Sequence, residues 1–217
     1  MQQFEILTLE TIDMVKRMAW LVEYRDAGTP FHLERIRGYV LTLAQGLGLP
    51  AAEAELMSVA AMLHDVGKAG LSEGSLLGRT GSLSTGDLET AKKHAGMGYE
   101  ILREAQAPVL QMGAKICLAH HERWDGSGYP RGLRGEQIPL EARLTGIADV
   151  FDALTTPRPY KKEVSLVEAR EILRELRDEV VIRAGLSNGE RVCVSPLETV
   201  VEGMQIDRGY LSPYFVT

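Results

Sequence analysis

The chain has few of the features that mark a secreted, membrane-spanning or nucleic-acid-binding protein. Its 217 residues include only two cysteines, Cys117 and Cys193, whose spacing fits neither a disulfide framework nor a cysteine-based metal site. No apolar run reaches the roughly 18–20 residues that a membrane-spanning helix needs. The opening segment, MQQFEILTLE, has no basic stretch followed by an apolar one, so a signal peptide is not predicted. Together these absences predict a cytoplasmic protein that does not enter a membrane.

Basic residues are also fewer than acidic ones. Lysine and arginine number 24 against 30 aspartates and glutamates, which gives a formal net charge of -6. Proteins that bind nucleic acid polymers rely on a basic field to attract the phosphate backbone, and the overall charge of this chain opposes such a field. A small anionic ligand is still compatible with the composition if metal ions and a few cations supply local positive charge.

Apolar periodicity predicts an all-helical protein. Apolar residues recur at helical spacing in successive segments, most of which are followed by glycine or proline. The predicted helices cover residues 9–26, 32–46, 51–66, 87–105, 108–122, 140–154 and 166–180. Between the third and the fourth, residues 69–86 are rich in glycine, serine and threonine and are predicted to form a long surface loop. The expected fold class is therefore all-α, a compact bundle of about seven helices.

The character of the sequence changes after about residue 181. The segment ERVCVS alternates polar and apolar residues like a strand, and the residues after it have no helical period. We therefore predict a boundary near residue 185, with a helical domain at 1–185 and a short β-like appendage at 186–217.

Histidines gather at the ends of the predicted helices, next to residues that form turns. The chain contains five of them: His32, His64, His94, His120 and His121. A lone histidine is usually structural, but a structural explanation here has to hold for each of the five separately. Neutral imidazole is the commonest metal ligand in proteins, and histidine with aspartate suits Fe, Mn or Zn better than Mg or Ca. The pattern predicts a metal site.

Two short motifs support this prediction. In HHERWDGSGYP, at residues 120–130, adjacent histidines diverge and can serve two neighbouring ions, and the glycines after them need a permissive backbone outside a helix. In the pair His64-Asp65, the carboxylate can bridge two ions, although this dipeptide alone is common. Lys68 follows one helical turn after His64, where it can complement the helix dipole or contact a phosphate; spacing alone leaves both open.

Five separated blocks resemble a known family. They are YRDAGTPFHLERI (24–36), HDVGKAG (64–70), KKHAGMGYEIL (92–102), HHERWDGSGYPRGLRGEQIP (120–139) and ADVFDALTTPRPYK (148–161). In this order they resemble the HD-GYP domain, a branch of the HD phosphohydrolase superfamily, over about residues 9–178. The resemblance implies an all-helical phosphodiesterase with a binuclear or trinuclear metal centre, which hydrolyses cyclic di-GMP to pGpG, GMP or both.

The resemblance also implies roles for individual residues. The implied metal ligands are His32, His64, Asp65, His94, His120, His121 and Asp149. The implied catalytic pair is Asp65, as the carboxylate that bridges the ions, and Lys68, as the lysine that contacts the substrate phosphate or the attacking water.

On the substrate side the signature is Gly128-Tyr129-Pro130. Tyr129 is expected to hydrogen-bond a phosphate or to lie against a guanine face. Arg158 and Lys161 match a basic pair that receives substrate phosphate. Asp152 is counted with this substrate-side set, one turn from Asp149, where it would support that ligand from behind.

Two neighbours of the signature have more ordinary expected roles. Trp124 is expected to pack against the domain core. Asp125 is expected to hydrogen-bond the backbone of the turn rather than to bind metal.

The implied cofactors are two divalent metal ions, with Fe or Mn favoured over Zn, Ni or Mg. Family members with a third ion carry a glutamate where this chain has Gly28, which offers no side-chain ligand. In the implied mechanism a hydroxide that bridges the two ions attacks phosphorus, while the ions neutralise the phosphate oxygens.

The chain also departs from the family pattern. The usual turn after the HD helix is replaced by residues 78–81, GRTG, and the closing segment that follows the last helix in the family is absent. Residues 197–217, LETVVEGMQIDRGYLSPYFVT, instead resemble the start of the apical domain of a 60-kDa chaperonin. We interpret them as an appendage outside the catalytic domain, with a strand pair that caps the helical core as the alternative.

Two other functions compete with an active cyclic di-GMP phosphodiesterase. One is an HD hydrolase for another cyclic dinucleotide or nucleotide. The other is a catalytically weak module that senses a cyclic dinucleotide or pairs with a diguanylate cyclase, which the intact ligand set disfavours. No sensor or receiver domain is predicted in the chain, so either a partner would supply the regulatory input or the chain is a fragment of a longer protein. The product, the identity of the metal and the oligomeric state, monomer or dimer, stay open.

Overall fold

The computed structural model describes residues 7–24, 31–71, 85–156, 164–165, 167–169 and 172–173. Within these ranges every regular element is a helix, which confirms the all-α prediction. The elements are α1 (Leu9–Glu23), α2 (His32–Gly46), α3 (Ala51–Ala61), the 3-10 helix η1 (Val66–Gly70), α4 (Thr85–Leu102), α5 (Pro108–Ala119), the 3-10 helix η2 (Gly135–Gln137) and α6 (Leu140–Thr155). Residues 167–169 and 172–173 are also helical, within the seventh predicted helix.

The helices begin at signals that the sequence carries. Thr8 caps α1 because its side chain accepts a hydrogen bond from the Thr11 amide at 3.2 Å. Pro108 opens α5, where its missing N–H has no cost, and Pro139 precedes α6. The predicted helices therefore begin within about two residues of the observed ones.

The third helix ends earlier than predicted. It was expected to run to residue 66, but α3 ends at Ala61 and the chain tightens into turns that lead to η1. The amides of Met62, Leu63 and His64 each bond the carbonyl three residues back, at 3.0–3.2 Å. Residues 64–65 therefore lie in a tight turn, and Lys68 lies in η1.

Close backbone contact between η1 and α4 accounts for this tightening. A β-carbon on Gly67 would collide with the carbonyl oxygen of His94 and the amide nitrogen of Gly98. Only glycine allows two backbones to approach so closely. The turn after α3 is thus fixed by a contact with a distant segment of the chain.

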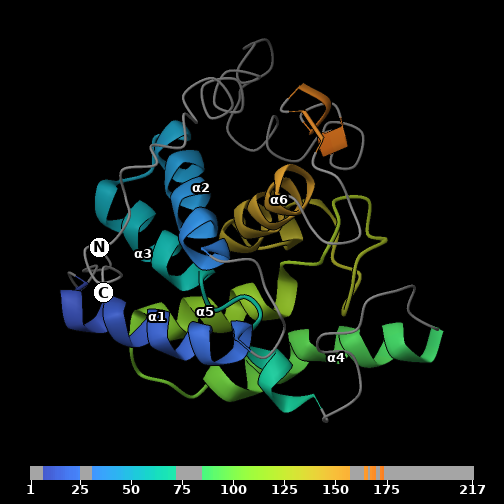
Figure 1. The fold of residues 1–217 in the computed structure, drawn as a ribbon, viewed down its shortest axis with the longest axis horizontal. Coiled ribbons are helices and arrows are strands. Elements are labelled where there is room, and N and C mark those ends of the chain that lie inside the picture. Colours follow the sequence, from blue (N-terminus) through green and yellow to red (C-terminus); the bar gives the residue numbers. More distant parts are fainter. Residues whose placement is uncertain are drawn as a thin grey trace, which may run out of the picture.

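The core lies between two groups of helices. Figure 1 shows α1 and α4 along the lower edge of the molecule, with α2 and α6 above them. The central helix α5 contacts α3, α4 and α6. Fully buried apolar side chains such as Ile36, Leu63, Ile116 and Leu144 join the layers. Each contributes roughly 1.5–3 kcal/mol by leaving water, so the core holds the helix ends in place.

In the part of the chain that the structure describes, none of the helices is both long enough and apolar enough to cross a membrane.

Candidate metal centre

The described residues include all seven predicted metal ligands, and the fold brings them together. His32 is the first residue of α2, His64 and Asp65 occupy the turn after α3, and His94 lies within α4. His120 and His121 follow the last turn of α5, which ends at Ala119 rather than at the predicted residue 122. Asp149 comes from α6. Their assignment as ligands stays a prediction, but segments more than 100 residues apart in sequence meet at one place.

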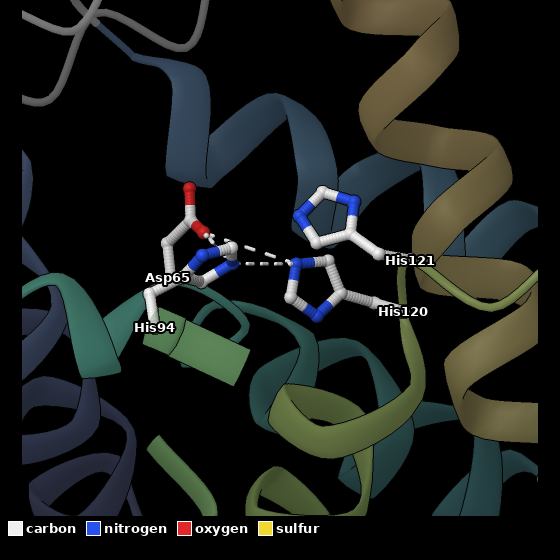
Figure 2. Close-up of side chains that lie close together, drawn as sticks. All are labelled: Asp65, His94, His120 and His121. Carbon is white, nitrogen blue, oxygen red and sulfur yellow. Dashed lines mark hydrogen bonds and ion pairs between the residues drawn. The ribbon is translucent and has the colours of Figure 1, made fainter. Parts of the chain in front are cut away.

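The ligand atoms form two adjoining groups. One contains Asp65, His94, His120 and His121, and the other contains His32, His64 and Asp149. Within each group the ligand atoms lie within 4.8 Å of one another. Figure 2 shows the first group, with Asp65 and His94 facing His120 and His121 from the opposite side.

Asp65 joins the two groups. Its Oδ1 lies 3.2 Å from Nε2 of His94 and 3.8 Å from Nε2 of His120. Its Oδ2 lies 3.4 Å from Nε2 of His64, which belongs to the other group. The two oxygens of one carboxylate thus face different groups, which is the arrangement expected of a bridging ligand.

Hydrogen bonds at Nδ1 orient four of the five imidazoles. In His64, Nδ1 donates to the carbonyl oxygen of Ala61 at 2.9 Å. In His94, Nδ1 donates to the carbonyl oxygen of Ala91 at 2.6 Å. His120 donates to two carbonyl oxygens of α5, at 3.0 and 3.1 Å. Because Nδ1 donates to a carbonyl, Nε2 is the ring nitrogen that faces the centre in each of these histidines.

The fourth oriented ring is His32, whose Nδ1 lies 2.8 Å from Oδ2 of Asp152. Asp152 is fully buried, and its carboxylate also accepts from the guanidinium of Arg35, with Nη2 3.0 Å from Oδ2. Burial opposes ionisation, but the bonds from His32 and Arg35 outweigh it and lower the pKa of Asp152 to about 2. In this position Asp152 supports His32 from behind.

The donor set fits a divalent metal ion. Nε2 of His64 is buried and makes no hydrogen bond among the described residues. Nε2 of His94 and Nε2 of His120 face each other at 3.5 Å, although the Nδ1 bonds leave both Nε2 atoms as acceptors in the neutral tautomer. Lone pairs at this distance repel one another unless a cation lies beside them. Imidazole nitrogen with carboxylate oxygen suits Fe, Mn and Zn.

Burial keeps the rings of His120 and His121 neutral. It lowers the pKa of His120 to about 4, helped by the neighbouring charge of His64, and holds the pKa of His121 well below its usual range. His64 differs, since the charge of Asp65 overcomes burial and raises its pKa to about 9. Lys68 and His64 in turn hold the pKa of Asp65 well below its usual range, against the effect of burial. Asp65 is therefore ionised and can attract a cation.

Lys68 reaches the centre from η1. Its Nζ lies 2.7 Å from Oδ2 of Asp65, so its ammonium is placed beside the carboxylate that joins the two groups. Arg158 and Lys161, the predicted phosphate-binding pair, lie outside the described residues, as do Gly28, residues 78–81 and the predicted appendage.

The Gly128-Tyr129-Pro130 signature folds back onto the centre. The Tyr129 ring stacks on His121, with ring centroids 4.6 Å apart and an interplanar angle of 26°. A β-carbon on Gly128 would lie 2.5 Å from Cα of Glu122, so only glycine fits there. Asp125 accepts from the amide and hydroxyl of Ser127, at 2.8 and 2.6 Å, which confirms its predicted role in the turn.

Three residues that the sequence did not single out hold this arrangement together. Arg35 supports Asp152, and its place three residues after His32 on one helix face was an available signal. Glu122 is a buried carboxylate that accepts from the amides of Arg131 and Leu133, at 2.7 and 3.0 Å. Its adjacency to His121 was the only local signal. Lys92, two residues before His94, lies over the Tyr129 ring.

Trp124 also lies in this loop, where it is partly exposed. Its carbonyl oxygen accepts from the Gly135 amide at 3.1 Å, and the guanidinium of Arg143 lies 5.8 Å from its ring centroid. Trp124 therefore joins the loop to η2 through its backbone and to α6 through its ring.

Comparisons with known proteins agree with this geometry. A model of the HD domain family matches residues 13–182. The cyclic di-GMP phosphodiesterase response regulator RpfG of Xanthomonas campestris is 47% identical over 150 residues, which cover 69% of this chain and 39% of that protein. The 3'3'-cGAMP-specific phosphodiesterase 2 of Vibrio cholerae is 40% identical over 161 residues, covering 74% of this chain and 31% of that protein. The chain thus spans less than half the length of these relatives.

A solved structure shares the fold. The crystal structure of a cyclic GMP-AMP specific phosphodiesterase of V. cholerae superposes with a TM-score of 0.60 and 17% identity, covering 89% of this chain and 49% of that chain. The resemblance of residues 197–217 to a chaperonin segment finds no support in these comparisons.

Proposed function

This chain belongs to the HD domain family, and on that premise we propose that it is a metal-dependent phosphodiesterase that hydrolyses cyclic di-GMP. One observation carries the proposal: two adjoining groups of nitrogen and oxygen donors that share the carboxylate of Asp65. The relative at 47% identity, which is named as a cyclic di-GMP phosphodiesterase, supports the choice of substrate.

The seven predicted ligands would hold two divalent ions, Fe or Mn in preference to Zn, Ni or Mg. Bound there, such ions supply Lewis acidity toward phosphate oxygens and an activated water as nucleophile. The chain contributes the spacing, since Asp65 faces both groups at once. It also contributes the ring orientations, since the bonds at Nδ1 turn Nε2 of His64, His94 and His120 inward.

Other residues of the chain would bind and orient the substrate. Lys68, held beside Asp65, can donate to a non-bridging phosphate oxygen. The hydroxyl of Tyr129 can donate to phosphate, because burial raises the pKa of the phenol and keeps it protonated. Arg158 and Lys161 would receive the second phosphate. Hydrolysis of one or both diester bonds would give pGpG, GMP or both.

One comparison supports a second candidate substrate. The relative at 40% identity is named as specific for 3'3'-cGAMP, which differs from cyclic di-GMP in one base. The proposed metal centre would act on the phosphate diester that both cyclic dinucleotides contain. Contacts with the bases would therefore decide between the two substrates. We place the enzyme in the cytoplasm, with a diguanylate cyclase or a sensor protein as the source of regulation.

The test is turnover of cyclic di-GMP and 3'3'-cGAMP by anaerobically purified protein, with elemental analysis of the same sample. We expect stoichiometric Fe or Mn and faster hydrolysis of cyclic di-GMP. The double variant His64→Ala/Asp65→Ala should lose both metal and hydrolysis, whereas Lys115→Ala, an exposed change on α5, should keep both. Hydrolysis that persists in the double variant would falsify the metal mechanism.

A further inference from the structure

One of the five imidazoles is held differently from the rest. Each of the other four has an Nδ1 hydrogen bond, but among the described residues the His121 ring has none. Its contacts are rings instead. Tyr129 stacks on it at 4.6 Å and 26°, and His120 lies 3.9 Å away, tilted by 42°.

The Tyr129 ring has a second contact, with Lys92. Nζ of Lys92 lies 5.6 Å from its centroid, within the distance at which an ammonium is attracted to an aromatic face. The same ammonium pairs with Glu89 at 2.6 Å, one turn earlier on α4. Lys92 therefore extends from a rigid helix, the one that also carries His94, onto the substrate-side loop.

We propose that Lys92 and Tyr129 are positioning residues for His121, and that they do for this ring what the Nδ1 hydrogen bonds do for the other four. The inference rests on the proposed metal centre. The contact with Lys92 holds the Tyr129 ring in place, and the stacked ring fixes the plane of the imidazole so that a nitrogen faces His94 and Asp65.

This arrangement also limits how Tyr129 can contact a substrate. One face of its ring is covered by His121, so that face is closed to a guanine base. The phenol hydroxyl and the other face of the ring are then the parts of Tyr129 that can meet the ligand. A loop residue on the substrate side thereby sets the geometry of a metal ligand, and metal affinity becomes sensitive to this loop.

The test measures Mn²⁺ affinity of the metal-free full chain by titration calorimetry. We expect Tyr129→Leu to weaken binding by about tenfold or more, as loss of an outer contact to a ligand does, while Tyr129→Phe keeps the stack and the affinity. Lys92→Met should weaken binding by about two- to fivefold, the scale of one cation–π contact. Lys92→Arg should restore it, and Lys93→Met, which removes a neighbouring exposed charge, is the matched control.

The sign of the Lys92→Met effect separates positioning from simple electrostatics. Removing a positive charge near a cation site strengthens binding if charge alone matters, whereas loss of positioning weakens it. A second readout is the ring-proton NMR spectrum of the histidines in the Zn²⁺-loaded protein. We expect Lys92→Met to reduce the ring-current shift that Tyr129 imposes on His121, and Lys93→Met to leave it unchanged.

The outcomes distinguish the two proposals. Wild-type protein that binds no Mn²⁺ would overturn the proposed function and the inference together. Wild-type protein that binds, with unchanged affinity and unchanged histidine shifts in Lys92→Met, would overturn the inference alone. If Tyr129→Leu does not fold, as judged by circular dichroism, the Lys92 and Lys93 variants decide the question, because on α4 Lys92 is partly exposed and Lys93 is exposed.

Discussion

The two donor groups of the candidate metal centre are supported by different kinds of structure. Behind the group of His32, His64 and Asp149 lies a buried ion pair, in which Asp152 bonds both His32 and Arg35. Behind the group of Asp65, His94, His120 and His121 lie backbone carbonyls and a stacked tyrosine. The first group depends partly on side chains that can be substituted, with a backbone carbonyl behind His64 alone, and the second depends on helix geometry and one loop. Substitutions should therefore affect the two groups separately, except at Asp65, which serves both.

The largest effect is expected at Asp65 itself. Asp65→Asn removes the charge that faces both groups, so we expect loss of both ions and a fall of hydrolysis to the background of the assay. Metal analysis and turnover measure this. Asp13→Asn, an exposed change on α1, is the control. One ion retained at full occupancy would show that the groups do not share this carboxylate.

The next largest effect is expected at Gly67. Gly67→Ala places a β-carbon against the backbone of α4, so η1 and α4 must separate. We expect a loss of about 1–3 kcal/mol in the free energy of unfolding, measured by urea denaturation, together with weaker metal binding. Gly96→Ala is the matched control, because a β-carbon there meets nothing within 4 Å. Alanine in a helix should stabilise the protein by about 0.5–1 kcal/mol at that position.

Asp152→Asn should weaken the donor group that contains His32 and leave the other group unchanged. It weakens the bond to His32 and leaves the carbonyl-supported rings untouched. We expect about 10–100-fold weaker binding of one ion, so that titration with Mn²⁺ resolves one tight and one weak site. Glu55→Gln, which alters a surface ion pair with Arg37, should keep the wild-type titration curve. Equal weakening of both sites would contradict the separation.

The smallest effect is expected at Glu122, which holds the loop rather than a ligand. Glu122→Gln keeps an oxygen for one of the two amides of Arg131 and Leu133 and removes the charge. We expect a destabilisation of about 1–3 kcal/mol and a rise in KM that exceeds the fall in kcat. Glu136→Gln, at an exposed position in η2, serves as the control. A fall in kcat alone would place Glu122 in the chemical step.

Sequence motifs predicted where the candidate ligands would gather, but not what holds them. The candidate ligands were predicted because the blocks that contain them resemble the HD-GYP domain, and the histidine pattern by itself had indicated only a metal site. The end of α3 was misplaced because residues 56–64 are all buried, so their apolar pattern continues past the last helical turn. What ends the helix is a contact with α4, at residues 94 and 98, which no local pattern encodes.

The supporting residues were missed for a related reason. Lys92 and Glu122 look like ordinary charged residues, and only the folded loop shows that one meets an aromatic ring and the other two amides. Arg35 was within reach, since it shares a helix face with His32. Residues that act through hydrogen bonds to distant backbone carry the weakest sequence signal.

The backbone contact between η1 and α4 has a consequence for how this protein can change over evolution. Because no side chain lies between Gly67 and Gly98, the separation of Asp65 from His94 is set by peptide geometry alone. Substitutions that repack the core can alter stability without moving these two residues relative to each other. The separation of Asp65 and His94 is thus little affected by substitutions among core side chains, while replacement of either glycine changes it directly.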